Sequence, residues 1–222
     1  MKYLFIFAFM SIIGWILEVL YRSFISKKFI NPGLMLGCSL PVYGVGGIIL
    51  NLLADIKVVN NIYFNYFILS LIAMVLLTLI EYVGGVLLEK IFKIKLWDYS
   101  KYKYNLKGLI CLRMSIIWGI VSLIYFVLLN NFLNEITLSF LSFEYANFLL
   151  GIYVGLFTFD LYFSMKLLNK IKKYSQKQKR IINFEMLKIQ ARDENANIFA
   201  LKKIFYLLYP YKNIYEFILT KW

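Results

Sequence analysis

Five stretches of predominantly apolar residues, separated by shorter polar segments, set the pattern of this chain. They cover approximately residues 3–21, 41–56, 62–92, 107–129 and 148–168. A helix needs about 20 apolar residues to cross the hydrocarbon core of a bilayer, and most of these stretches reach that length. The pattern therefore predicts an all-α fold, a polytopic membrane helix bundle with about five transmembrane helices within residues 1–168.

The third stretch is longer than one crossing requires. Either a single tilted helix covers it, or the helix breaks at Gly84-Gly85 and continues as a cytoplasmic or interfacial helix. Glycines also mark the second stretch, at Gly44, Gly46 and Gly47. We interpret these three as sites of close helix packing through small residues rather than as an anion-binding helix start.

Basic residues alternate between the two sides of the predicted bundle. Three follow the first stretch, one follows the second, and six lie between Lys90 and Lys107. None follows the fourth stretch, where Glu135 and Glu144 lie, whereas thirteen occur from Lys166 onward. The positive-inside rule then predicts an N-terminus outside and a C-terminus in the cytoplasm.

Residues 169–222 contain no spanning stretch and form a second predicted part of the chain. This segment is basic, aromatic and helical in pattern, and it contributes much of the formal net charge of +13. Such a tail is expected to lie on the anionic inner surface of the membrane. Charge alone would also suit nucleic acid, but nothing else in the sequence supports that partner, and we expect none.

Composition removes several classes of chemistry. The chain is 61% hydrophobic and contains no histidine, so it cannot build a histidine-dependent catalytic group or a histidine-ligated metal site by itself. No G-x-x-x-x-G-K-[ST] phosphate loop occurs. Cys38 and Cys111 lack a disulfide spacing pattern and are expected to be free thiols. We therefore expect no cofactor, no metal and no enzymatic activity.

Four charged residues fall inside the apolar stretches at similar predicted depths. Glu18, Glu81, Arg113 and Asp160 lie roughly 6–14 Å inside the cytoplasmic boundary, at about 1.5 Å of helical rise per residue. One interpretation is a layer that binds a proton, a cation or a cationic group of a substrate. The other, which we favour, is structural: Arg113 ties two acids together while Glu18 pairs with Arg22 one turn away.

The predicted cytoplasmic loops carry further candidates. Asn31-Pro32-Gly33 suits a type II turn, since proline fixes φ and glycine accepts a positive φ. Trp97 and Tyr99 are expected to anchor the chain at the lipid headgroups. Asp98 between them is expected to form a local ion pair or a helix cap.

These pieces together are similar to a known family of bacterial membrane proteins, the type IV ABC-transporter permease family, also called CmpB-like. The similarity covers about residues 10–120. It rests on Gly14-Trp15 with Glu18, Asn31-Pro32-Gly33 with Gly37, Pro41-Val-Tyr43-Gly44-Val-Gly46, Glu81-Tyr82-Val-Gly84, Glu89, Trp97-Asp98-Tyr99-Ser100, Asn105, Gly108-Leu-Ile-Cys111 and Trp118-Gly119. The chain departs from the family pattern at Gly37-Cys38, where Gly-Pro is common, and at Leu96-Trp97, where a doubled tryptophan is common.

The resemblance implies the membrane subunit of an ABC-type transporter in a bacterial cytoplasmic membrane, with the bilayer and a separate ATPase as partners. Five short spans enclose little pathway, so a homo-oligomer or a partner is expected. The alternatives are a membrane scaffold or envelope-assembly factor and, least favoured, an intramembrane enzyme using a buried carboxylate. The candidate residues for coupling to an ATPase are Asn31, Pro32, Gly33, Glu89, Trp97, Asp98 and Tyr99.

Overall fold

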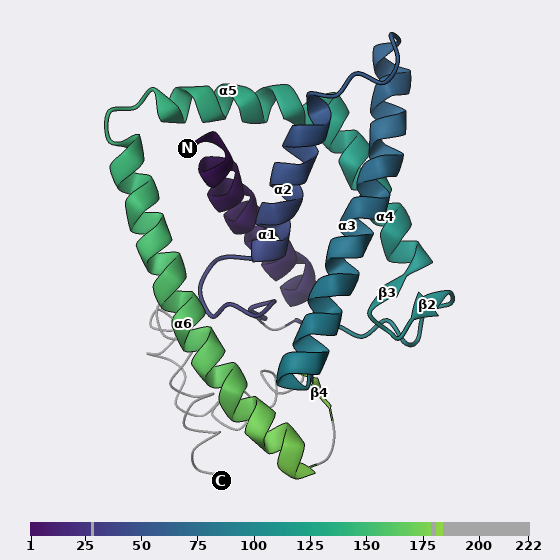
Figure 1. The fold of residues 1–222 in the computed structure, drawn as a ribbon, viewed down its shortest axis with the longest axis vertical. Helices are drawn as coiled ribbons and strands as arrows, with labels where there is room; N and C mark the ends of the chain where they lie inside the picture. Colours follow the sequence, from purple (N-terminus) through teal and green to yellow (C-terminus); the bar gives the residue numbers. More distant parts are fainter. Residues whose placement is uncertain (28, 179–180, 184–222) are drawn as a thin grey trace. The chain divides into compact units, whose positions relative to one another are not determined.

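The computed structural model describes residues 1–27, 29–178 and 181–183 of the chain. Long helices dominate it (Figure 1). They are α1 (Lys2–Ser26), α2 (Pro41–Ala54), α3 (Ile62–Phe92), α4 (Leu112–Ile124), the π-helix η1 (Tyr125–Leu129), α5 (Asn130–Leu141) and α6 (Ala146–Gln178). The predicted fold class, an all-α membrane helix bundle, is confirmed.

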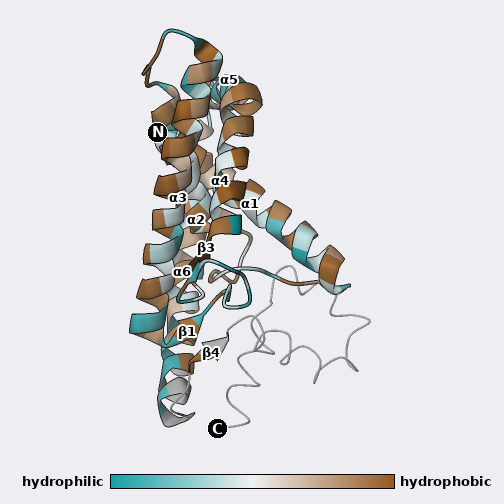
Figure 2. Cartoon of the chain, turned by 90° about the vertical axis from the view of Figure 1, so that its right-hand side faces the viewer, coloured by the Kyte–Doolittle hydropathy of each residue, from teal (hydrophilic) through white to brown (hydrophobic). Residues whose placement is uncertain are grey.

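Within the described part of the chain, four helical stretches combine spanning length with high hydropathy. They are Lys2–Ser26, Ile62–Phe92, Leu112–Leu141 and Ala146–Asn169. Hydrophobic residues predominate along the long helices in Figure 2, and many of their large apolar side chains are exposed, as expected for helices that face lipid. The protein is therefore a multi-pass membrane protein.

Helix α2 is apolar but has only 14 residues. Its length of about 21 Å is less than the roughly 30 Å of a hydrocarbon core. With α2 counted as a crossing, the chain crosses five times, and this odd number places its two ends on opposite sides. The orientation with the N-terminus outside stays a prediction.

Helix α3 continues without interruption through 31 residues, including Gly84 and Gly85. The alternative of a helix break at these glycines is therefore wrong. At about 1.5 Å per residue the helix is roughly 46 Å long, more than one crossing requires. The excess length is accommodated by tilt or by extension beyond the hydrocarbon.

The predicted loop after the fourth stretch is mostly a helix. The chain leaves α4 through one π-helical segment, Tyr125–Leu129, and then forms α5, which lies across the end of α4 in Figure 1. A π-helical turn is a common site of local reorientation. The side chain of Asn51 in α2 donates a hydrogen bond to Asn134 Oδ1 in α5 at 3.1 Å. This bond holds α5 against α2.

The described residues form two compact units, and the first contains residues 1–14, 41–84 and 98–155. Its buried core joins α1, α2, α3, η1 and α5 through one continuous apolar cluster. The members are Ile6, Leu50, Leu53, Leu69, Ala73, Leu77, Tyr125, Phe126 and Leu133.

Glycines allow α2 to pack closely on α1 within this unit. A Cβ atom built at Gly44 would collide with the Ser11 side chain, and one built at Gly47 would collide with Met10. The predicted role of these glycines in close packing is thereby confirmed. A Cβ built at Gly151 or Gly155 in α6 would meet no described atom within 4 Å.

The second unit contains residues 15–40, 85–97 and the described residues from 156 onward. Its core brings the loop after α1 together with the end of α3 and the second half of α6. The members are Leu36, Phe92, Ile94, Leu167, Leu168 and Ile171. Two short strands, β1 (Ile94–Lys95) and β4 (Ile182–Asn183), pair in parallel.

A small hairpin lies between α3 and α4. Strand β2 (Asn105–Leu106) pairs antiparallel with β3 (Ile110–Cys111). The fourth helix therefore begins at Leu112 and not at the predicted residue 107, because the preceding residues pair as strands.

Helix α6 extends to Gln178, beyond the predicted boundary of the membrane domain at residue 168. Most of the predicted tail, 169–222, lies outside the described residues. Its expected place on the inner membrane surface stays a prediction.

Candidate functional site

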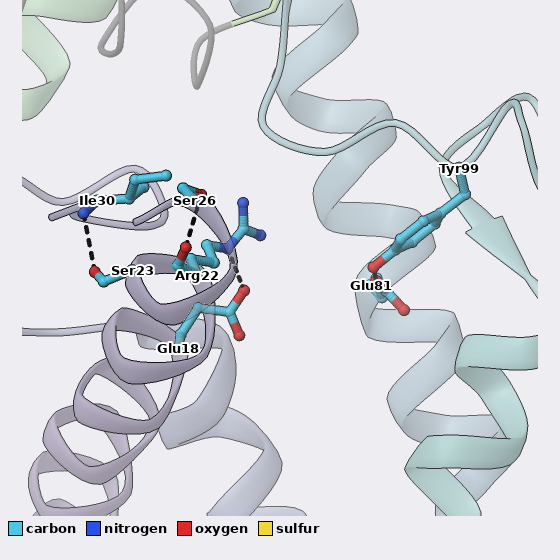
Figure 3. Close-up of polar contacts among 7 residues, drawn as sticks. All are labelled: Glu18, Arg22, Ser23, Ser26, Ile30, Glu81 and Tyr99. Atoms are coloured by element: carbon cyan, nitrogen blue, oxygen red, sulfur yellow. Dashed lines mark hydrogen bonds and ion pairs between the residues drawn. The ribbon is translucent and has the colours of Figure 1, made fainter. Parts of the chain in front are cut away.

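The carboxyl group of Glu81 is buried within the first unit. Glu81 in α3 is 6% exposed. The hydroxyl of Tyr99 donates a hydrogen bond to its Oε1, and the indole nitrogen of Trp118 donates one to its Oε2, each at 3.0 Å. The contact with Tyr99 is drawn in Figure 3. Both oxygens of this buried carboxyl group thus accept a hydrogen bond from a neutral side chain.

Aromatic packing extends this arrangement to the other helices of the unit. The Trp118 ring meets the Tyr43 ring edge-on, with centroids 5.8 Å apart. The Tyr43 ring in turn fills the space beside Gly14 of α1, where a Cβ would collide with it. We call Glu81, Tyr99, Trp118 and Tyr43 the Glu81 cluster, which connects α2, α3, α4 and the hairpin.

The hairpin that supplies Tyr99 is shaped by Asn105. The Asn105 amide donates to the carbonyls of Tyr102 at 2.8 Å and Ser100 at 3.3 Å, and its oxygen accepts from the Gly108 N–H at 3.0 Å. The Tyr99 N–H also donates to the Gly108 carbonyl at 2.8 Å. Gly108 has φ of +70°, a conformation that glycine adopts without strain. These bonds hold Tyr99 in reach of α3.

Arg113 contacts an aromatic ring of the hairpin. Its side chain is exposed, and its guanidinium lies over the Tyr102 ring at 5.5 Å from the centroid. A guanidinium binds an aromatic ring as well as a carboxylate, so the sequence alone does not reveal this contact. The role of Arg113 as a bridge between two acids stays a prediction.

The predicted pair between Glu18 and Arg22 is confirmed. Arg22 Nε donates to Glu18 Oε1 at 2.7 Å within α1 (Figure 3). The last turn of the helix is closed by Ser26, whose hydroxyl donates to the Arg22 carbonyl at 2.7 Å. The hydroxyl of Ser23 accepts the Ile30 N–H at 3.1 Å, which begins the loop after α1.

Asp160 holds that loop against α6 in the second unit. Its Oδ1 accepts the Leu36 N–H at 3.0 Å, and its Oδ2 accepts the Gly37 N–H at 2.9 Å. Ser164, one turn further along α6, donates to Oδ1 at 3.2 Å. A carboxylate that accepts two consecutive backbone N–H groups fixes both the position and the direction of the loop.

Asn31 connects the same loop to α1. Its Oδ1 accepts the indole N–H of Trp15 at 2.7 Å, and its Nδ2 donates to the Leu36 carbonyl at 2.8 Å. We call Trp15, Asn31, Leu36, Gly37 and Asp160 the Asp160 cluster. Its hydrogen bonds connect α1, the loop and α6.

The thiol of Cys38 follows this cluster directly in the chain. Both cysteines are free, as predicted, with Cys38 exposed and Cys111 buried. Although Cys38 keeps exposed surface, its surroundings remove enough water to raise the pKa of its thiol, and the negative charge of Asp160 raises this pKa further.

We expect Asp160→Asn to lower the pKa of the Cys38 thiol, because the substitution removes a nearby negative charge. The rate of alkylation by a water-soluble maleimide, measured against pH, should then reach half its maximum at a lower pH than in the parent protein. Cys111→Ser in both proteins confines the reaction to Cys38. A higher plateau with an unchanged midpoint would show altered exposure instead and contradict this prediction.

The loop residues predicted to couple to an ATPase differ in their burial. Pro32 is buried, while Gly33, with φ of +75°, and Glu89 are half-buried. Trp97 is half-buried as well, whereas Asp98 is exposed and accepts the Ser100 N–H at 3.0 Å in a local turn. Tyr99 contacts Glu81 rather than acting only as the expected headgroup anchor.

The four predicted intramembrane charges divide between the units. Glu81 and Arg113 belong to the first unit, and Glu18 and Asp160 belong to the second. Their role as one charged layer stays a prediction. In the described part of the chain, no group of three or more Cys, Asp and Glu side chains is placed to hold a metal ion.

Sequence reasoning missed the partners of Glu81 and Asp160. Tyr99 and Trp118 occur in the motifs quoted above, but nothing in their spacing joins them to Glu81. The partners of Asp160 are backbone N–H groups more than 120 residues away, at a separation of 124 for Leu36. Because every residue except proline has a backbone N–H, the residue type does not reveal such a partner.

The chain was compared with known protein families, curated proteins and solved structures. No curated protein and no solved structure matched the chain. Residues 5–165 match the family described as Putative ABC-transporter type IV. This range contains every residue of the Glu81 cluster and the Asp160 cluster. The chain belongs to that family.

Proposed function

We propose that this protein is the membrane subunit of an ABC-type transporter in the cytoplasmic membrane of a bacterium, acting with a separate ATPase. The observation that carries the proposal is the family match over residues 5–165, on a chain with four helices of spanning length. The sequence has no phosphate loop of the Walker type. We therefore assign nucleotide hydrolysis to a partner chain and no catalytic step to this one.

The Glu81 cluster supports a coupling role for the loop between α3 and α4. Tyr99 joins the base of the hairpin to α3 through Glu81, and Trp118 joins the same carboxyl group to α4. Under this proposal, an ATPase that moves Trp97, Asp98 or Tyr99 displaces two spanning helices at once. The turn at Asn31 would provide a second contact, connected to α1 and α6 by the Asp160 cluster.

The contact with an ATPase predicts a specific co-purification. The tagged protein, extracted from its own membranes in mild detergent, should retain an ATPase subunit in a fixed ratio, identified by mass spectrometry. Asp98→Arg should reduce that retention, because it reverses a charge at the proposed contact, while Lys57→Gln, on the opposite predicted side, should not. A retained ATPase whose hydrolysis rate is unchanged by this subunit would contradict the proposal.

A membrane scaffold is the second candidate. One observation favours it: the polar groups of both clusters bind other parts of this same chain, which suits a rigid framework. In the purification above, envelope-building proteins in place of an ATPase would support the scaffold and exclude the transporter.

A further inference from the structure

The hairpin between α3 and α4 and the first turn of α4 carry a dense positive charge. Four cations and a single acid, Asp98, occur within residues 98–113. The cations are Lys101, Lys103, Lys107 and Arg113, and all four are exposed. The hairpin lies on the side predicted to be cytoplasmic. A surface of this charge attracts anionic partners.

Aromatic rings accompany these cations on the surface. Tyr104 is 81% exposed and Tyr102 is 42% exposed. The Tyr102 ring already contacts the guanidinium of Arg113. Exposed tyrosines beside lysines at the end of a spanning helix are typical of the lipid headgroup region, where a ring contacts acyl chains and its hydroxyl stays hydrated.

Apolar side chains lie next to this charged surface. Leu106 in the hairpin is 49% exposed, and Leu112 and Ile116, one turn apart on α4, are 50% and 48% exposed. Figure 1 shows the hairpin projecting sideways from the start of α4 instead of extending the axis of that helix. Exposed cations and exposed apolar side chains therefore occur together in the hairpin and the first turns of α4.

We propose that this surface, defined as Lys101, Tyr102, Lys103, Tyr104, Lys107 and Arg113, binds the headgroup of an anionic phospholipid. The lysines and Arg113 would contact the phosphate, while Leu106, Leu112 and Ile116 would contact the acyl chains. An acidic protein surface would satisfy the charge, but it would leave the neighbouring leucines without an apolar partner. The inference goes beyond the proposed transporter role, since a scaffold could use the same site.

Lipid retention provides the first test. Phosphatidylglycerol or phosphatidylcholine is added to the detergent-purified protein, and bound lipid is counted by native mass spectrometry. Lys101→Gln/Lys103→Gln should weaken phosphatidylglycerol binding by about tenfold and leave phosphatidylcholine binding unchanged. The matched control Lys57→Gln/Lys90→Gln removes two exposed lysines elsewhere and should have little effect. Equal losses in the two double variants would overturn the proposal.

Cross-linking in cells shows whether the neighbour of this surface is a lipid or a protein. Tyr104→p-benzoylphenylalanine places a photoreactive group on the most exposed ring of the surface. Irradiation should attach phospholipid, detected as a mass increase of the purified protein. Attachment to another polypeptide chain instead would overturn the lipid assignment. Co-purification of an ATPase, measured on the same sample, would be unaffected by either result and tests the transporter proposal separately.

Discussion

Replacing Glu81 by alanine is expected to destabilise the protein by about 2–4 kcal/mol, one of the two largest effects we predict. The substitution leaves the Tyr99 hydroxyl and the Trp118 indole N–H without their acceptor in a buried setting, and each lost acceptor costs about 1–3 kcal/mol. The melting temperature in detergent should fall by about 5–10 °C. Trypsin should also cut faster at Lys101 and Lys103, because the hairpin loses its attachment to α3.

Two companion variants show which property of Glu81 matters. Glu81→Gln keeps an acceptor for the Trp118 N–H, and its amide can donate to the Tyr99 oxygen, so the fold should be largely retained. Loss of transport with intact folding in this variant would support a role for the charge. Glu89→Ala, two turns along the same helix face and half-buried, serves as the control and should change the melting temperature little. Equal destabilisation by Glu81→Ala and Glu89→Ala would refute the central role of Glu81.

The second large effect is expected from Asp160→Ala. This substitution removes the acceptor for two consecutive backbone N–H groups, of Leu36 and Gly37. Hydrogen bonds to a charged group contribute about 1.5–3 kcal/mol each when shielded from water. Because Asp160 is only half-buried, we expect a total loss of about 2–3 kcal/mol. Hydrogen–deuterium exchange at residues 34–38 should accelerate by at least about tenfold.

Ser164→Ala is the matched control for this experiment. The Ser164 hydroxyl donates its hydrogen bond to Asp160 Oδ1 on the same helix, and not to the loop. Its removal should leave exchange at residues 34–38 nearly unchanged. If Asp160→Ala accelerated exchange throughout α6 and not in the loop, Asp160 would be stabilising its own helix, and the proposed attachment of the loop would be incorrect.

The sequence predicted contacts that depend on local spacing. Glu18 and Arg22 stand four residues apart, and in a helix that separation places the two charges on one face. The close approach at Gly44 and Gly47 followed from the absence of side chains in an apolar helix. The first contact follows from helical geometry and the second from residue size. Both properties can be read from a single segment of the sequence.

Long-range contacts were predicted poorly. The contact of the Arg113 guanidinium with the Tyr102 ring was not predicted, because a guanidinium binds a ring as readily as an anion. Helix α5 was read as a loop, since its apolar positions are mixed with Asn134 and Glu135. Its helical state depends on packing and on the hydrogen bond from Asn51, which no local pattern reveals.

The sequence by itself determined that this protein is a helical membrane protein, because the cost of exposing polar backbone in lipid forces long apolar stretches into helices. It also located the acids Glu81 and Asp160 within the apolar stretches, where a carboxyl group is costly enough to stand out. Only the tertiary structure decided what each acid binds: the side chains of Tyr99 and Trp118 in one case, and the backbone of Leu36 and Gly37 in the other. These hydrogen-bond partners depend on which segments of the chain meet in space. Hydropathy is summed over neighbours in the sequence, so it contains no information about contacts between distant segments.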